Sequence, residues 1–218
     1  MSMTIYFDKA LSKLKARTVV LDSAFERNLL IANPNKCADR YAVQEGLMSS
    51  LWQAWCMYCR TIIFGSLTDG LTVNGNRVSS AYAHLTDREL VYLAQKASQG
   101  SNLATATVRS AQPHTEMTWG DALKLNPVIT AFNPSNSGIL ISGLGAVSFL
   151  LDLQKFRNAN AHITSFTIGE VKSAQVKYTH TKFRHPSDTM FWIDPQTNDY
   201  LWKSWIEEIE LISEAIAQ

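Results

Sequence analysis

The sequence has little of the charge and cysteine that mark several classes of protein. Only 18% of its 218 residues are charged, and the formal net charge is +1. These values exclude a uniformly basic nucleic-acid-binding protein and an acidic disordered chain, so any nucleic-acid site must be a local patch. The three cysteines do not form the even set of a secreted disulfide scaffold. We therefore expect a reducing, cytoplasmic location.

Long hydrophobic runs are also lacking. The N-terminal stretch MSMTIYFDKALSKLK has no uncharged apolar core, so we expect it to be neither a signal peptide nor an anchor. The longest uncharged apolar run, GILISGLGAVSFLL over 138–151, is well short of the ~20 residues that span a bilayer. We expect this run to be a buried core helix, and we expect no membrane partner.

Signatures of nucleotide, metal and esterase sites do not occur either. Gly143-Leu-Gly145 lacks the third glycine and the preceding strand of a dinucleotide-binding fingerprint, so it predicts close helix packing instead. Walker A and Gly-x-Ser-x-Gly sequences are missing. The histidines show neither His-Glu-x-x-His spacing nor pairing with cysteine. We therefore expect no metal and no cofactor.

What the chain does have is hydrophobic periodicity typical of helices. Between 43 and 64, apolar residues recur three and four apart in two adjoining stripes, which predicts a central helix. The stripes are Leu47, Leu51, Trp55, Tyr58 and Ile62, and Met48, Trp52, Cys56, Cys59 and Ile63. No βαβ pattern surrounds Cys56 and Cys59, so packing is favoured over a redox role for them.

Capping and breaking residues predict where further helices begin and end. Thr86-Asp-Arg-Glu89 is a capping box that starts a helix at Thr86. Thr118-Trp-Gly-Asp121 predicts a short helix that must stop before Pro127. The C-terminal segment predicts an amphipathic closing helix. Its apolar stripe is Trp202, Trp205, Ile209, Ile212 and Ile216.

These patterns predict a mainly all-α fold, an up-and-down helical bundle in one domain over 1–218. With 46% hydrophobic residues, the chain can bury a sizeable core. Residues 68–80 contain Asp-Gly and Asn-Gly and predict a loop or small hairpin. Alternating polar and apolar residues predict a long loop or a small β-hairpin insertion near 169–194.

The stretch FRNANAHI over 156–163 follows the most apolar run of the chain and is polar. Continued by helical turns, the stripe of Leu140, Leu144, Val147 and Leu151 passes Lys155 and arrives at Asn158 and His162. Polar residues on a core-facing line indicate a cleft, an interface or a buried hydrogen-bonded network. Spacing alone favours the interpretation that Arg157 and His162 only cap the helix end and bind its last carbonyls.

The sequence Phe156-Arg-Asn-Ala-Asn-Ala-His162 resembles the signature of the HEPN superfamily, an Arg followed by a polar residue and then a His four to six residues beyond the Arg. The short motif covers only a handful of residues, while the helical architecture covers about two-thirds of the chain. The resemblance implies a helical bundle that dimerises and brings two copies of the motif together. It also implies metal-independent endoribonuclease activity, with Arg157, Asn158 and His162 in the site and a role in toxin–antitoxin or antiphage systems.

These residue types suit RNA cleavage chemically. The 2′-OH of RNA attacks the adjacent phosphate with the help of a base, an acid and a group that compensates charge on the phosphoryl oxygens. An imidazole titrates near neutrality, so two His162 residues related by a dimer axis could supply the base and the acid. Arg157 would hold the phosphate, and Asn158 would orient His162 or the phosphate.

Charge near the motif favours RNA binding. Six basic residues face one acid, Glu170, between 155 and 185. Five of the six, besides Arg157, are expected to bind RNA, with aromatic rings nearby on which bases could stack. They are Lys155, Lys172, Lys177, Lys182 and Arg184. The other interpretation of this segment is a solvated hairpin with scattered lysines.

Two functions from other classes remain open. One is a HEPN-like module without catalysis that binds a nucleotide or RNA in the same dimer groove. The other is a helical adaptor in which Arg157 and His162 are structural. The expected partners of the catalytic form are RNA, a second copy of the chain, and an antitoxin or regulatory protein.

Overall fold

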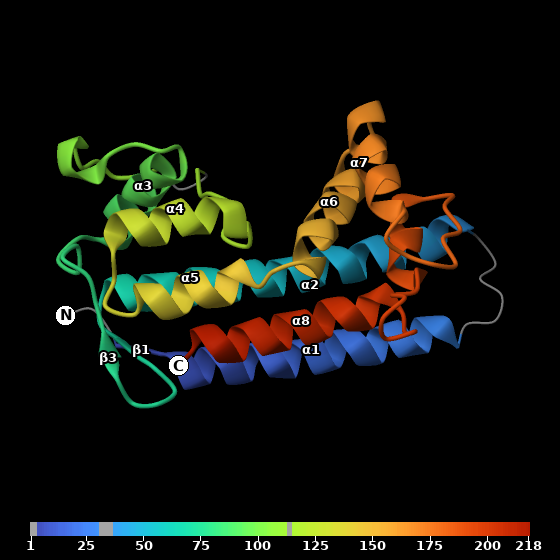
Figure 1. Cartoon of the computed structure of the whole chain (residues 1–218), viewed down its shortest axis with the longest axis horizontal. Helices are drawn as coiled ribbons and strands as arrows, with labels where there is room; N and C mark the ends of the chain where they lie inside the picture. Colours follow the sequence, from blue (N-terminus) through green and yellow to red (C-terminus); the bar gives the residue numbers. More distant parts are fainter. Residues whose placement is uncertain (1–3, 31–36, 113–114) are drawn as a thin grey trace. The chain divides into compact units, whose positions relative to one another are not determined.

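The computed structural model describes residues 4–30, 37–112 and 115–218, and it is mainly helical (Figure 1). The all-α fold with a small β insertion is thus confirmed. The described residues form two compact units, one from those within 1–14, 55–147 and 212–218, the other from those within 15–54 and 148–211. A single domain over 1–218 stays a prediction. Within the described residues, no single helix has the length and apolarity needed to cross a bilayer.

In the first unit, the predicted hairpin over 68–80 forms part of a three-stranded sheet. Strands β2 (Gly70–Leu71) and β3 (Arg77–Val78) are antiparallel, as expected from the turn residues between them. Strand β1 (Ile5–Tyr6) adds a parallel edge to β2, with Ile5 opposite Gly70. A Cβ on Gly70 would crowd both the Gly65 carbonyl and the Phe7 ring, so the close approach of these segments needs glycine there.

Helices α3 (Asp87–Ser98), α4 (Ala122–Phe132) and α5 (Ser137–Gly145) also belong to the first unit, with the 3-10 helix η1 (Leu103–Thr105). The capping box is confirmed, since the Thr86 amide donates to the Glu89 carboxylate at 2.9 Å. The prediction that a helix stops before Pro127 is wrong. Asp121 caps α4, and the helix continues through Pro127. Proline has no amide hydrogen to donate to the Leu123 carbonyl, but Leu123 and Pro127 are both exposed, so water can bind that carbonyl instead.

The stripes predicted for 43–64 and for the C-terminal segment lie on two long helices, α2 (Cys37–Leu67) and α8 (Leu201–Ile216). A third long helix, α1 (Phe7–Leu29), was not predicted from the sequence. Apart from half-buried Cys56, every residue of the two stripes predicted for 43–64 is buried in α2. The stripe of α8 is buried throughout, as predicted for an amphipathic helix. Between them, these faces supply much of the hydrophobic core.

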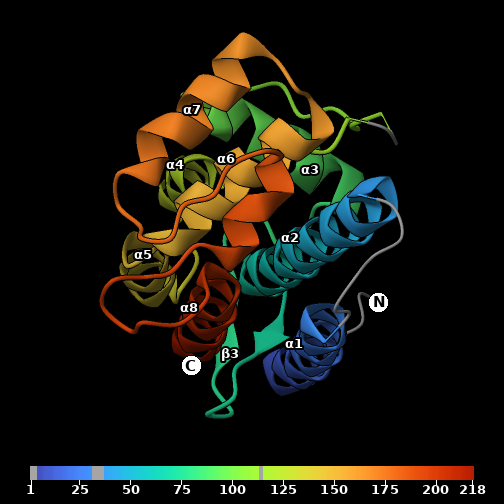
Figure 2. The same ribbon diagram turned by 90° about the vertical axis from the view of Figure 1, so that its right-hand side faces the viewer.

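The second unit contains α6 (Phe149–Ala161), α7 (Ser165–Gln175) and the 3-10 helix η2 (Pro186–Phe191). Helices α6 and α7 pack side by side, as Figures 1 and 2 show. The Phe156 ring contacts Trp192 and Trp205 at centroid distances of 5.4 and 6.0 Å. The loop or hairpin expected near 169–194 begins instead as the second half of α7, and its later part is a loop that contains η2 and is closed by the bridge between Thr179 and Ile193.

The run 138–151 is not one buried helix, contrary to the sequence prediction. Helix α5 ends at Gly145 and α6 begins at Phe149. The Glu208 carboxylate accepts hydrogen bonds from the amides of Ser148, Phe149 and Leu150, at 2.8, 3.0 and 2.6 Å. A carboxylate at this position satisfies the free amides and the positive end of the helix dipole, which stabilises a new helix start.

Candidate functional site

The polar motif occupies the last turns of α6 and the residue that ends the helix. Arg157 and Asn158 are half-buried on α6, whereas His162 is exposed. His162 has φ −142° and ψ 86°, outside the helical region, although its amide still donates to the Asn158 carbonyl at 2.9 Å. His162 therefore ends the helix and presents its imidazole at the surface.

The predicted core-facing line through Asn158 and His162 is wrong, because the break before α6 changes the helical phase. Helix α6 buries Leu150, Leu153, Phe156 and Ala159, each three residues from the last. The line extrapolated from α5 through residue 151 no longer applies beyond the break. The motif thus lies beside the core rather than in it, which leaves Arg157, Asn158 and His162 accessible to a ligand.

The turn that follows His162 is tightly hydrogen-bonded. The Thr167 hydroxyl donates to the His162 carbonyl at 2.7 Å. Thr164 is the N-cap of α7, and its hydroxyl accepts from the Thr167 amide at 3.2 Å while its own amide donates to the Thr167 hydroxyl at 3.0 Å. This reciprocal capping fixes the backbone between the two helices. His162 is therefore held by a defined turn, although its side chain is in solvent.

Arg157 and Asn158 are brought together, since a guanidinium nitrogen of Arg157 lies 3.4 Å from the Asn158 side-chain oxygen. Among the described residues, Arg157 forms no ion pair with an acid. Within the same part of the chain, the His162 imidazole makes no hydrogen bond that would join it to Arg157 or Asn158. A guanidinium left in this state favours an anionic ligand.

Two of the five expected RNA-binding cations are engaged elsewhere. The carboxylate of Asp152 is 1% exposed and accepts from Lys155 at 3.0 Å and from Lys177 at 2.8 Å. It also accepts from the Tyr178 hydroxyl at 2.7 Å. Burial by itself would raise the pKa of Asp152, but the hydrogen bonds from Lys177, Tyr178 and Lys155 outweigh it and leave the pKa lowered.

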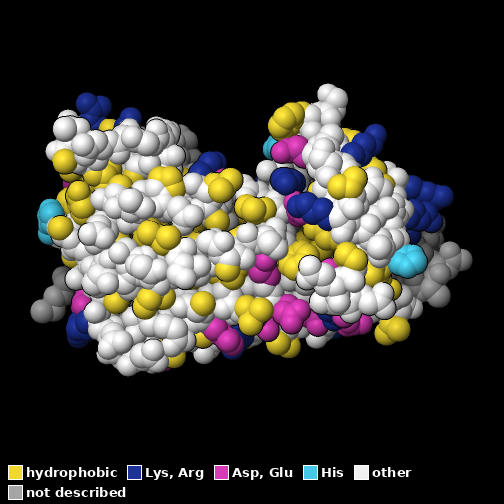
Figure 3. Space-filling model, viewed as in Figure 1, with side chains coloured by type: hydrophobic (Ala, Val, Ile, Leu, Met, Phe, Trp, Pro, Cys, Tyr) yellow, Lys and Arg dark blue, Asp and Glu magenta, His cyan; other side chains and the backbone are white. Residues whose placement is uncertain are grey.

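The remaining cations, Lys172, Lys182 and Arg184, are exposed and form no ion pair within the described residues. The predicted excess of basic charge is smaller once both flanking acids are included: from 152 to 188, six cations face Asp152, Glu170 and Asp188. Figure 3 shows basic, acidic and hydrophobic side chains intermixed on the surface over α6 and α7. On the face that Figure 3 shows, the cationic surface is therefore discontinuous.

Asn160 lies inside the motif but was not predicted to be a site residue. Its side-chain amide donates to the Met48 sulfur at 2.9 Å, while its side-chain oxygen is buried without a hydrogen-bond partner among the described residues. The position of Asn160 inside RNANAH could be read from the sequence. Its contact with Met48 could not, because Met48 is distant in the sequence. Asn160 anchors the last turn of α6 to α2.

His185 belongs to a separate cluster. Its ring stacks on Tyr41 at 4.3 Å between centroids, and its two ring nitrogens lie 3.2 Å from a Glu45 carboxylate oxygen and 2.9 Å from the Ser187 hydroxyl. Ser187 is fully buried, so this arrangement is a structural connection rather than a nucleophilic site. Within the described ranges, no three His, Cys, Asp or Glu residues are placed to hold a metal ion.

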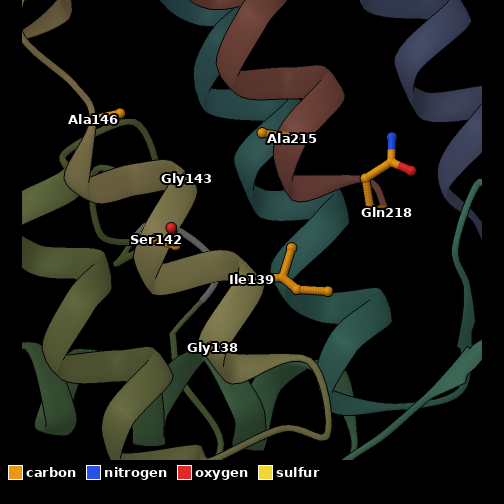
Figure 4. Close-up of a pocket in the computed structure, with 7 residues that line it drawn as sticks. All are labelled: Gly138, Ile139, Ser142, Gly143, Ala146, Ala215 and Gln218. Atoms are coloured by element: carbon orange, nitrogen blue, oxygen red, sulfur yellow. The ribbon is translucent and has the colours of Figure 1, made fainter.

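An open groove of about 630 Å³ lies in the first unit, lined mainly by small and apolar residues of α5 and by the end of α8 (Figure 4). Ser142 and Gly143 lie on the α5 wall, and Ala215 and Gln218 on the α8 wall. None of the residues predicted for the site lines it. The groove contains no charged side chain, so nothing in it could bind a phosphate through charge.

Comparison of the whole chain with protein-family models, curated proteins and solved structures finds no match. The HEPN resemblance therefore rests on the motif and on the helical architecture alone.

Proposed function

We propose that this chain is a metal-independent endoribonuclease of the HEPN type, acting through a composite active site at a homodimer interface. Arg157 and His162 are the catalytic residues, and Asn158 assists them. RNA is the substrate, and the products carry 2′,3′-cyclic phosphate ends. The resemblance implies a role as a toxin or antiphage effector, with an antitoxin or regulatory protein as a further partner, and the cysteine content favours a cytoplasmic location.

The observation that carries the proposal is the state of Arg157. Its neighbour Lys155 is one of the two lysines held by the buried Asp152, whereas Arg157 has no acidic partner among the described residues and only Asn158 beside it. A half-buried guanidinium without a counter-ion gains from binding an anion. RNA supplies that anion as a phosphate, which a guanidinium can bind through two parallel hydrogen bonds.

The proposed reaction balances without any further reactant. A base removes the 2′-OH proton while the 2′ oxygen bonds to phosphorus and the bond from phosphorus to the 5′ oxygen breaks. An acid gives a proton to the departing 5′ oxygen. Two His162 side chains, one from each copy of the chain, supply the base and the acid. Arg157 stabilises the charge that develops on the phosphoryl oxygens.

A second candidate function is RNA binding or protein interaction without cleavage. The observation that favours it concerns the imidazole of His162. Among the described residues, none makes a hydrogen bond with this ring that would fix its tautomer. In a homodimer the second copy could supply that contact. In a binding module it would not be needed, so an activity measurement separates the two functions.

Cleavage of end-labelled single-stranded RNA in excess EDTA tests the proposal. We expect the wild type to leave 2′,3′-cyclic phosphate ends, and the Arg157→Ala and His162→Ala variants to lose at least about 100-fold in rate, the usual contribution of a proton carrier or a charge-stabilising group. Asn158→Ala should retain more activity, because its role is to orient other groups.

Matched controls come from exposed residues of the other unit. Arg109→Ala and His84→Ala remove the same side-chain types far from the motif in sequence and should cleave like the wild type. Light scattering and circular dichroism would show that every variant keeps its mass and its helical content. Full activity of Arg157→Ala or His162→Ala would exclude catalysis by this motif.

A further inference from the structure

We propose that Phe166 is a stacking platform for an unpaired RNA base next to the scissile phosphate, so that the substrate is single-stranded at the cleavage site. This inference rests on the proposed function and specifies its substrate class. It concerns the turn between α6 and α7, where the motif ends and an aromatic ring is left in water.

Phe166 is 71% exposed, and its neighbour Ile163 is 63% exposed. Other aromatic residues of this unit, such as Phe156 and Trp192, are buried in the core. Phe166 contributes little to that core, since α7 instead buries Thr167, Val171 and Ala174. Two exposed apolar side chains thus flank a turn whose other residues are polar.

The turn holds Phe166 and His162 four residues apart on a fixed backbone. The hydrogen bond from the Thr167 hydroxyl to the His162 carbonyl spans the turn, and the capping pair of Thr164 and Thr167 closes it. An aromatic ring on a rigid turn loses little conformational entropy when a base stacks on it. Phe166 is therefore preorganised relative to the backbone of the predicted catalytic residue.

The surroundings of the ring leave room for a base. Side chains of a helix lean toward its N-terminus, which directs Phe166 toward the turn that carries His162. On the C-terminal side, Gly169 is exposed, and a Cβ built there would meet no atom within 4 Å. Because position 169 carries no side chain and no other atom lies close to it, a base stacked on Phe166 would not be blocked from the Gly169 side.

A nucleotide fits this patch better than a protein does. Phe166 and Ile163, between exposed Thr164 and Ser165, are too few to form a protein interface of roughly 800 Å² per partner by themselves, so a dimer interface would have to extend beyond this patch. A base needs only one ring face, and its phosphate needs a cation. Arg157, in the last turns of α6, supplies a cation that has no acidic partner among the described residues.

The test measures, by fluorescence anisotropy, the binding of 2′-O-methyl RNA, which has no free 2′-OH and so cannot be cleaved by this mechanism. We expect the wild type to prefer a single strand to the matching duplex. Phe166→Ala should weaken single-strand binding about 5- to 100-fold, as the loss of one stacked base does, and should leave duplex binding nearly unchanged. Phe166→Trp should restore the affinity, whereas Phe166→Leu, which keeps apolar bulk without a ring, should not.

Val176→Ala is the matched control, because Val176 is 86% exposed at the other end of α7. Unchanged single-strand affinity of Phe166→Ala would overturn the stacking platform while leaving the ribonuclease intact if RNA is still cleaved. A change in oligomeric mass by light scattering, with RNA affinity unchanged, would assign the patch to an interface between copies instead. Failure of the wild type both to bind and to cleave RNA would overturn the proposed function itself.

Discussion

At the scale of single residues, the environment of each cation decides what it can bind. Lys155 and Arg157 are two residues apart on α6, yet only Lys155 is held by an acid of the described structure. The contact between Asp152 and Lys155 could be expected from their spacing of three on a helix. The contacts of Asp152 with Lys177 and Tyr178 could not, because they join residues about 25 apart through tertiary packing.

Because of Asp152, we expect the free energy of unfolding to depend on pH. Its pKa is lowered in the folded state, so its contribution is fully present above the unfolded pKa of about 4 and is lost as the pH falls through the folded pKa. We expect Asp152→Asn to lower the free energy of unfolding by about 1–3 kcal/mol at pH 7, with a smaller difference from the wild type below pH 4. Urea unfolding at several pH values measures this.

Glu207→Gln is the control for Asp152→Asn, because Glu207 is exposed and its change should be near neutral at every pH. A difference between the wild type and Asp152→Asn that stays constant from pH 7 to pH 3 would contradict the assigned role of the buried carboxylate.

At the scale of elements, periodicity predicted where helices lie better than where they break. The stripes of α2 and α8 and the capping box of α3 are local patterns, and the structure confirms them. The break between α5 and α6 was not predicted, because it depends on Glu208, about 60 residues further along the chain. Because the break was not predicted, the helical phase expected beyond it was wrong, and so were the expected positions of Asn158 and His162.

The start of α6 should depend on Glu208. Glu208→Ala removes the acceptor for three amides, so we expect a loss of about 1–2 kcal/mol in the free energy of unfolding and faster hydrogen exchange at Phe149 and Leu150. Glu208→Gln, which keeps an acceptor oxygen, should lose less. The adjacent, exposed Glu207→Ala serves as the control, and an equal loss there would refute the capping role.

Two glycines of α5 should respond to alanine with opposite signs. A Cβ on Gly143 would collide with the branched side chain of Ile216, as the close packing predicted for Gly143-Leu-Gly145 requires, whereas a Cβ on Gly145 would meet no atom within 4 Å. Gly143→Ala should therefore destabilise the protein by about 1–3 kcal/mol. Gly138 has nothing within 4 Å of its Cβ position, so Gly138→Ala should stabilise it by about 0.5–1 kcal/mol. Thermal unfolding measures both effects. Changes of the same sign and size in the Tm of Gly143→Ala and Gly138→Ala would contradict the difference in packing.

At the scale of the whole molecule, the division into two units could not be predicted from the sequence. Each unit is assembled from separated segments, and α1, α2 and α8 each contribute residues to both. A boundary of this kind leaves no linker, no change in composition and no gap in the apolar stripes. The residues proposed for the site, in contrast, could be nominated from the sequence because FRNANAHI is a continuous motif at the end of one helix.

In the proposed mechanism the 2′-OH of RNA attacks its own phosphate at Arg157 and His162, and a pair of matched oligonucleotides tests this directly. One is a single-stranded RNA that the wild type cuts, and the other carries a single 2′-deoxy substitution at the mapped cut. We expect cleavage of the first with a cyclic phosphate end, no cleavage of the second at that position, and none of either by His162→Ala. Cleavage at the 2′-deoxy position, undiminished activity of His162→Ala, or no cleavage of any single-stranded RNA tested would contradict the claim.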